Sequence, residues 1–156
     1  MNINELSMVV GSLGIVLAVV QLRLSYRQSI TSFEDDIAKE YRQLASTLPT
    51  SALLGIPLNE EDYRNMRDEF YRYFDFCNGQ IFLRQYGRVT RFTWLFWCDG
   101  IRTNMQRPAF AMAWNDISTS SNTDFSELRR LISENFKTDP RFWDSTFLVR
   151  IWRVIF

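Results

Sequence analysis

The stretch GSLGIVLAVVQLRLSYRQ, Gly11 to Gln28, passes from an apolar run into two arginines with no break in its pattern. From Leu6 to Leu22 the chain has no formal charge, and this length makes about 25 Å of helix, the short end of what spans a bilayer. A helix on the surface of a soluble domain has a polar face, whereas Met8 to Val20 is apolar all round except at Ser12. The stretch therefore predicts a transmembrane anchor, with a buried core helix as the alternative.

The charges on either side of this run predict how it is oriented. A cleavable signal peptide has a positive start and a small-residue cleavage site, but here the start is MNINE and the exit is VVQLRLSYR. Arg23 and Arg27 follow the run, while Glu5 precedes it. The positive-inside rule then places the N-terminus outside and the C-terminus in the cytoplasm.

An apolar stripe continues beyond the run at spacings of three and four residues. Between Gly14 and Pro49 there is no glycine or proline, so we expect one helix to pass from an anchor at residues 1–24 into a helical stalk at residues 25–48. The stripe could pack on the rest of the chain or on a second copy of it. Its residues are Leu22, Tyr26, Ile30, Phe33, Ile37, Tyr41 and Leu44.

Residues 49–156 are predicted to form a cytoplasmic helical domain. Pro49, Gly55 and Pro57 indicate a loop with one possible helical turn, and Asn59 can cap a helix that reaches Tyr86 and stops at Gly87. Further helices are expected over residues 88–104, from Pro108 to about residue 117, and from Thr123 or Asp124 to Phe136. The predicted fold class is all-α: a single transmembrane helix continuing into a bundle of about four to five helices.

Composition excludes several functional classes. Eighteen Lys and Arg balance eighteen Asp and Glu, so the basic surface of a nucleic-acid binder is missing. The chain has no histidine, which excludes a Ser-His-Asp triad, a Cys-His dyad and a histidine-containing zinc site. Cys77 and Cys98 lack metal-ligand spacing and are expected to be reduced, buried thiols, with a disulfide as the alternative. We expect no enzyme activity, cofactor or metal.

Several polar residues stand among aromatic ones in the second and third predicted helices. One interpretation is a polar pocket, which an enzyme would need, and the other is a buried network that fixes the packing of the helices. We expect the network. Its residues are Arg72, Asp75 and Asn78, followed by Asp99 and Arg102 with Asn104 beside them.

The C-terminal segment TFLVRIWRVIF, residues 146–156, is rich in residues that favour strands and also fits helical spacing. Because no other part of the chain offers a partner strand, we expect this segment to be a helix. It would suit an amphipathic helix lying in the membrane interface, with Trp143, Arg150, Trp152 and Arg153 as the interfacial residues. The alternative is a C-terminal helix that closes the core.

Three segments together resemble a widespread bacterial family of unknown function. They are AVVQLRLSYRQS, FYRYFDFCNGQIFLRQYGRV and TWLFWCDGIRTNMQRPAFAMAW, and the resemblance extends from about Gly11 to Trp114. Such a family member has one N-terminal span and a small cytoplasmic helical domain. The resemblance implies a location in the bacterial inner membrane and supplies no catalytic residues.

These patterns favour a non-enzymatic scaffold or interaction protein at the cytoplasmic face of the membrane. Its expected partners are the lipid bilayer and either a second copy or another membrane-associated protein, with no small-molecule substrate. The main alternative is an oligomeric effector or sensor that perturbs the bilayer, with phage defence as one role that such a protein could serve. A third hypothesis is an enzyme built on the Asp, Arg and Asn side chains.

Overall fold

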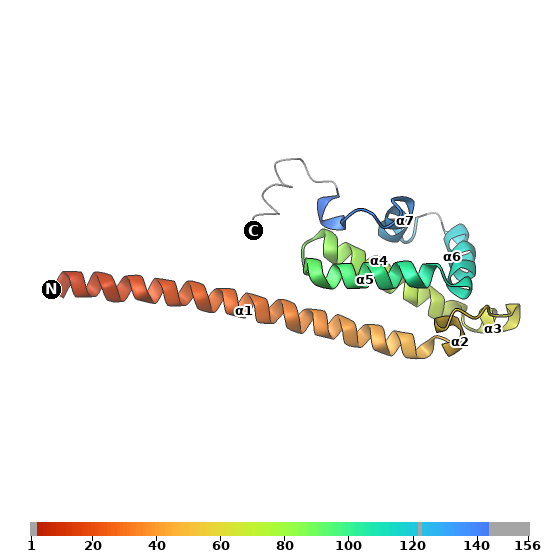
Figure 1. The fold of residues 1–156 in the computed structure, drawn as a ribbon, viewed down its shortest axis with the longest axis horizontal. Helices are drawn as coiled ribbons and strands as arrows, with labels where there is room; N and C mark the ends of the chain where they lie inside the picture. Colours follow the sequence, from red (N-terminus) through yellow and green to blue (C-terminus); the bar gives the residue numbers. More distant parts are fainter. Residues whose placement is uncertain (1–2, 122, 144–156) are drawn as a thin grey trace. The chain divides into compact units, whose positions relative to one another are not determined.

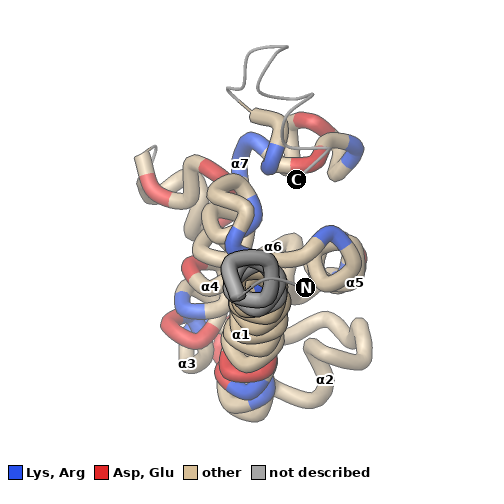
Figure 2. Tube along the Cα trace, turned by 90° about the vertical axis from the view of Figure 1, so that its left-hand side faces the viewer, with Lys and Arg blue, Asp and Glu red and all other residues tan. Residues whose placement is uncertain are grey.

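The computed structural model describes residues 3–121 and 123–143, with side chains described from residue 14 onward. In these ranges the chain forms seven α-helices and one 3-10 turn, with no strand (Figure 1). The predicted all-α fold class is confirmed. Lys and Arg positions are interspersed with Asp and Glu positions along the described part of the chain (Figure 2).

The first helix, α1, runs unbroken from Ile3 to Thr47. The predicted continuity of this helix is confirmed. The helix ends just before Pro49, which lacks the backbone N–H that a continuing helix needs. The chain divides into two compact units, residues 1–37 and 38–156, so the boundary falls inside α1 and ahead of the predicted one at residues 48 and 49.

The membrane anchor receives no support from the helices as described. Where side chains are described, no helix is both long enough and apolar enough to cross a bilayer. The apolar run begins at Leu6, so its first part lies outside those side chains. The anchor stays a prediction.

Two short helices connect α1 to the domain. The possible turn in the proline-rich loop is α2, Thr50–Leu53, and α3 spans Glu60–Asn65. The Asn59 side chain accepts a hydrogen bond from the Asp62 amide at 2.8 Å, as predicted for an N-cap. The acidic residues of the first turn of α3 lie where the helix dipole favours them.

The helix predicted from Asn59 to Tyr86 is divided in two. Helix α4 begins only at Arg67 and ends at Gln85, because Met66 has a φ of −113° and its amide bonds to Tyr63 in a tighter turn. No glycine or proline marks this break. The predicted stop at Gly87 is confirmed: its φ is +70°, and the Gly87 and Arg88 amides bond to the carbonyls of Arg84 and Leu83, as in a Schellman motif.

The remaining α-helices differ from their predicted bounds: the first begins later, the second ends later and the third is shorter at both ends. Helix α5, Arg91–Met105, starts after Thr90, whose hydroxyl accepts a bond from the Thr93 amide. Helix α6, Pro108–Ser120, has proline in its first turn, as expected. Helix α7 is short, Ser126–Ser133, because residues on both sides of it have positive φ. A 3-10 turn, η1, follows at Pro140–Phe142.

Helix α4 is the centre of the domain and packs against α6, α7 and η1. Phe70 and Tyr73 on α4 both meet the ring of Phe110 on α6 edge-on, with ring centroids 5.1 and 5.0 Å apart. Phe74 meets Trp114 of α6 in the same manner at 5.1 Å. Edge-to-face pairs of this kind stabilise the fold by more than the apolar area that they bury. Many of the aromatic residues of the chain therefore serve the packing of α4 against α6.

Candidate binding site

The predicted buried polar network does not form from the residues chosen for it. Arg72, Asp75, Asp99 and Arg102 are all exposed. Asp99 and Arg102 do share a face of α5 and form an ion pair, but it lies on the surface. The prediction was wrong because helix α4 buries Phe70, Tyr73, Phe74 and Cys77, a face that turns residues 72 and 75 toward solvent.

Asn78, the remaining residue of the predicted network, is half-buried and has a different structural role. Its side-chain oxygen accepts hydrogen bonds from the Glu127 and Leu128 amides, both at 3.0 Å. Helix α7 has no side-chain cap of its own, since Phe125 occupies the N-cap position in the left-handed conformation. Asn78 therefore caps α7 from a neighbouring helix.

Replacing Asn78 with alanine is expected to lower the free energy of unfolding by about 0.5–2 kcal/mol, the usual cost of losing an N-cap. Amide hydrogen exchange at residues 127 and 128 should accelerate more than exchange in the middle of α4. Asp75→Ala, which changes an exposed side chain one turn earlier, is the matched control. Equal stability in the two variants would contradict this capping role.

Three polar side chains of the described residues are buried: Asn104, which was expected to lie beside the polar network, and Arg84 and Gln80, which were not predicted. The Asn104 side-chain amide donates to the Tyr73 hydroxyl at 2.8 Å. Arg84, 2% exposed, donates to both carboxylate oxygens of Asp139 and to the Val89 carbonyl at 2.8 Å. Gln80 is 5% exposed. Gln80 and Arg84 both follow Cys77 on the buried face of α4. Their position within the apolar stripe of this helix is the sequence signal that could have predicted their burial.

A further cluster joins α3, α4 and α6 at the edge of the core. Asp116 accepts a hydrogen bond from the Tyr63 hydroxyl and another from the Arg67 Nε at 2.8 Å. These hydrogen bonds, with Tyr63 the larger contributor, hold the pKa of Asp116 below its ordinary value of 3.8. Burial, reinforced by Asp116, raises the pKa of Tyr63 to about 12.

The lowered pKa of Asp116 predicts a stability that depends on pH. Because the folded protein binds this proton less readily than the unfolded chain, the contribution is present above pH 4 and disappears as pH falls through the folded pKa. Asp116→Asn should be less stable than wild type at pH 7, by under about 1 kcal/mol since the pair is 42% exposed. Urea unfolding from pH 7 to 2 should show this gap closing, and a gap of constant size would contradict the assignment.

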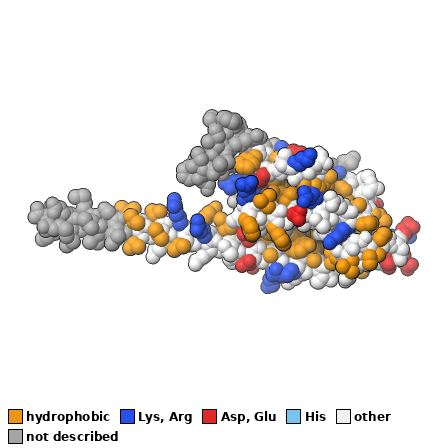
Figure 3. Space-filling view, in the orientation of Figure 1, with side chains coloured by type: hydrophobic (Ala, Val, Ile, Leu, Met, Phe, Trp, Pro, Cys, Tyr) orange, Lys and Arg blue, Asp and Glu red, His pale blue; other side chains and the backbone are white. Residues whose placement is uncertain are grey.

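Helix α5 presents an apolar face to solvent. Phe92 is 85% exposed, Leu95 57% and Phe96 77%. The opposite face of the same helix is buried through Trp94, Ile101 and Asn104. In the space-filling view, hydrophobic side chains gather over the part of the domain where α5 lies (Figure 3).

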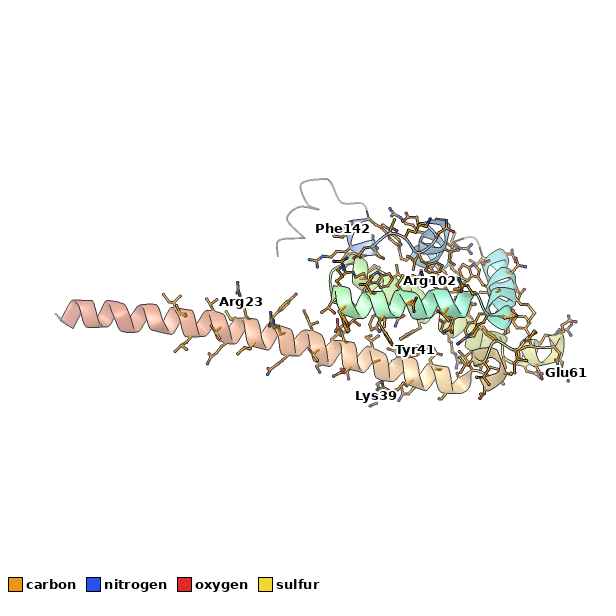
Figure 4. The ribbon with its side chains drawn as sticks, viewed as in Figure 1. Arg23, Lys39, Tyr41, Glu61, Arg102 and Phe142 are labelled. Atoms are coloured by element: carbon orange, nitrogen blue, oxygen red, sulfur yellow. The ribbon has the colours of Figure 1, made fainter. Side chains whose placement is uncertain are left out.

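A cavity of about 390 Å³ lies between this helix, α4 and the last turns of α1. Aromatic side chains form much of its wall, and Gln80 is a polar residue within it. Tyr41 extends from α1 toward α4 and α5 (Figure 4), and its ring centroid is 6.1 Å from that of Phe76. The lining includes Ala38, Tyr41, Arg42, Tyr73, Cys77, Gln80, Phe96, Trp97, Gly100 and Ile101.

Both cysteines are free thiols in the structure, Cys77 buried and Cys98 half-buried. Burial raises the pKa of Cys77 to about 12 and that of Cys98 to about 11. Each thiol is therefore neutral near pH 7 and is a poor nucleophile. The described residues contain no cluster of histidine, cysteine or acidic side chains that could hold a metal ion.

The predicted interaction stripe on α1 is divided between the two compact units. Leu22, Tyr26, Ile30, Phe33 and Ile37 belong to the first unit, in which Leu22 is 70% exposed and Tyr26 65%. Tyr41 and Leu44 belong to the second unit, where Tyr41 meets Phe76 and Leu44 is half-buried. The end of the stripe thus packs on the chain's own domain.

The predicted membrane-interface tail is described only at its start. Trp143 is buried: its indole donates to Glu134 at 3.1 Å and to Thr138 at 3.0 Å, and the Arg130 guanidinium lies 4.5 Å from the ring centroid. The assignment of Trp143 to a membrane interface was therefore wrong, because its ring closes the domain. Arg150, Trp152 and Arg153 lie outside the described residues.

Comparison with known proteins gives no relative for this chain: no family model, curated protein or solved structure matches it.

Proposed function

We propose that this chain is a non-enzymatic interaction protein, anchored in the bacterial inner membrane by its N-terminal run and acting through its helical domain in the cytoplasm. It works by self-association or by recruiting another membrane-associated protein. The observation that carries the proposal is the exposed apolar face of α5, formed by Phe92, Leu95 and Phe96. Contiguous apolar side chains on a folded surface are typical of protein contacts.

The position of these side chains, rather than the composition of the chain, makes the face distinctive. The same helix buries Trp94, and the core of the domain buries Phe70, Phe74 and Phe110 completely. Exposing two phenylalanines and a leucine on one helix leaves an apolar area in water that a partner would cover. A pair of aromatic residues at the end of α4, Phe82 and Tyr86, is also exposed, with ring centroids 4.5 Å apart.

The interaction face is tested by measuring the mass of the full-length chain in mild detergent by light scattering. We expect wild type to be an oligomer or to carry a partner, and the double variant Phe92→Ser and Phe96→Ser to be a monomer. Leu54→Ser is the control, because Leu54 is 72% exposed and lies on the short helix-loop segment instead. A monomeric wild type without a partner would contradict the proposal.

The anchor is tested separately in cells. The chain should remain in the membrane pellet after alkaline carbonate extraction, and Val16→Arg together with Val19→Arg should release it, because arginine at the centre of a span is strongly unfavourable. The control places the same two arginines at Ser29 and Ser32, beyond the apolar run. Release of the wild-type chain by carbonate would remove the anchor from the proposal.

A membrane-perturbing effector is the less favoured alternative. It was predicted from the aromatic and basic tail, yet Trp143 at the start of that tail is a core residue. The exposed face of α5 remains the better supported contact.

A further inference from the structure

The wall of the cavity beside α5 contains a largely buried amide side chain, that of Gln80. Gln80 is 5% exposed and lines the cavity, and within the described residues its side-chain carboxamide makes no hydrogen bond to the protein. In the described residues the fully enclosed side-chain atom without a hydrogen-bond partner is Glu69 Oε2, so the Gln80 amide instead faces the space of the cavity. A ligand that displaces water from this space can complete the hydrogen bonds of the amide. The carboxamide is therefore the feature of this cavity that points to a ligand.

The other walls define the kind of ligand that would fit. Four aromatic residues line the cavity, Tyr41, Tyr73, Phe96 and Trp97, and Ala38 and Ile101 add aliphatic surface. Aromatic walls of this kind stack well on a planar heterocycle. The volume of about 390 Å³ falls within the range of roughly 300–1,000 Å³ typical of small-molecule sites.

The charges differ between the inner part of the cavity and its rim. Inside, the Cys77 thiol is neutral, and the Tyr73 hydroxyl already accepts a hydrogen bond from Asn104. At the rim stand Arg42 and Asp99, and Asp99 forms an ion pair with Arg102. A neutral group is therefore suited to the inside, while Arg42 can attract an anionic group at the entrance.

We propose that this cavity binds a mononucleotide, with its base stacked among Tyr41, Phe96 and Trp97 and its phosphate beside Arg42. The Gln80 carboxamide offers an acceptor oxygen and a donor nitrogen side by side, which matches the adjacent donor and acceptor on the edge of a nucleobase. The balanced charge of the chain argues for a free nucleotide rather than a nucleic-acid strand, whose phosphates need many basic partners. This site shares Phe96 with the protein contact proposed for α5, whereas Gln80, Tyr41 and Arg42 belong to the cavity alone.

Calorimetric titration of the full-length chain in mild detergent tests the proposal, with AMP, GMP, CMP and UMP as probes. At least one nucleotide should bind with a Kd below about 1 mM. Ribose 5-phosphate is the control for the phosphate alone and should bind far more weakly. Failure of all four nucleotides at that concentration, or equal binding of ribose 5-phosphate, would overturn the site.

Gln80→Met is the decisive variant, because it keeps the size of the side chain and removes both hydrogen-bonding groups. It should weaken nucleotide binding at least tenfold, roughly the value of one hydrogen bond, while melting no lower than wild type. Gln43→Met, on the exposed side of α1, is the matched control and should bind normally. Unchanged affinity in Gln80→Met, or a clearly lower melting temperature, would show that Gln80 serves packing instead.

A second pair of variants tests the cavity without touching Gln80. Gly100 lines the cavity in the middle of α5, and a Cβ added there would meet nothing within 4 Å. Gly100→Leu should fill part of the space and lower the affinity for the nucleotide, whereas Gly100→Ala should keep it and melt higher, since alanine is the better helix residue. Equal binding by both variants would place the ligand elsewhere.

Discussion

Replacing Arg84 with alanine is expected to lower the free energy of unfolding by about 3–5 kcal/mol, the usual result of breaking a buried ion pair from one side. Arg84 is 2% exposed and holds Asp139 through two hydrogen bonds while also donating to the Val89 carbonyl. Alanine would leave a largely buried carboxylate and a buried carbonyl without their donor. Urea unfolding followed by circular dichroism measures the change.

Arg102→Ala provides the matched control for this effect. Arg102 also pairs with an aspartate, Asp99, but both side chains are more than half exposed. The expected loss is under about 1 kcal/mol, because water already solvates the two charges. Equal free energies of unfolding for the two arginine variants would show that the buried ion pair of Arg84 stabilises the fold no more than the exposed pair of Arg102.

Phe110→Ala should cost about 3–5 kcal/mol, the range for removing a buried aromatic side chain. Phe110 is fully buried, and its ring meets Phe70 and Tyr73 edge-on where α6 crosses α4. Phe96→Ala removes the same side chain from a position 77% exposed and should change stability by less than about 0.5 kcal/mol. Thermal unfolding of the three proteins would test this, and a large loss in Phe96→Ala would mean that the exposed face of α5 supports the fold.

The sequence predicted the helical elements well where a local signal marked a boundary. Three such boundaries were confirmed. Asn59 caps the start of a helix, Gly87 adopts the positive φ that ends one, and Pro108 lies in a first turn, where its missing backbone N–H costs nothing. The break at Met66 was not predicted, because no residue type there disfavours a helix and only tertiary packing decides it.

The candidate site could be predicted only in part. The segment FTWLFWC of α5 is apolar apart from Thr93, so periodicity could not tell that Trp94 would be buried and Phe92 exposed. Polar residues among aromatic ones were read as buried, yet in α4 the exposed face holds Arg72 and Asp75. Gln80 and Arg84 lie in the apolar stripe of α4, and this position was the better sequence indication of a buried polar residue. What surrounds each of them depends on distant segments: Asp139 pairs with Arg84, and residues of α1 and α5 line the cavity beside Gln80.

The contact between Arg84 and Asp139 also determines how the domain can be shortened. Asp139 lies beyond the last α-helix described, in the short stretch that leads through η1 to Trp143. A fragment cut at the end of α7 would keep every α-helix that the structure describes in the domain and would still lose the carboxylate of Asp139, which neutralises the buried Arg84. Truncation libraries and limited-proteolysis maps should therefore treat residues 139–143 as core and not as a dispensable linker.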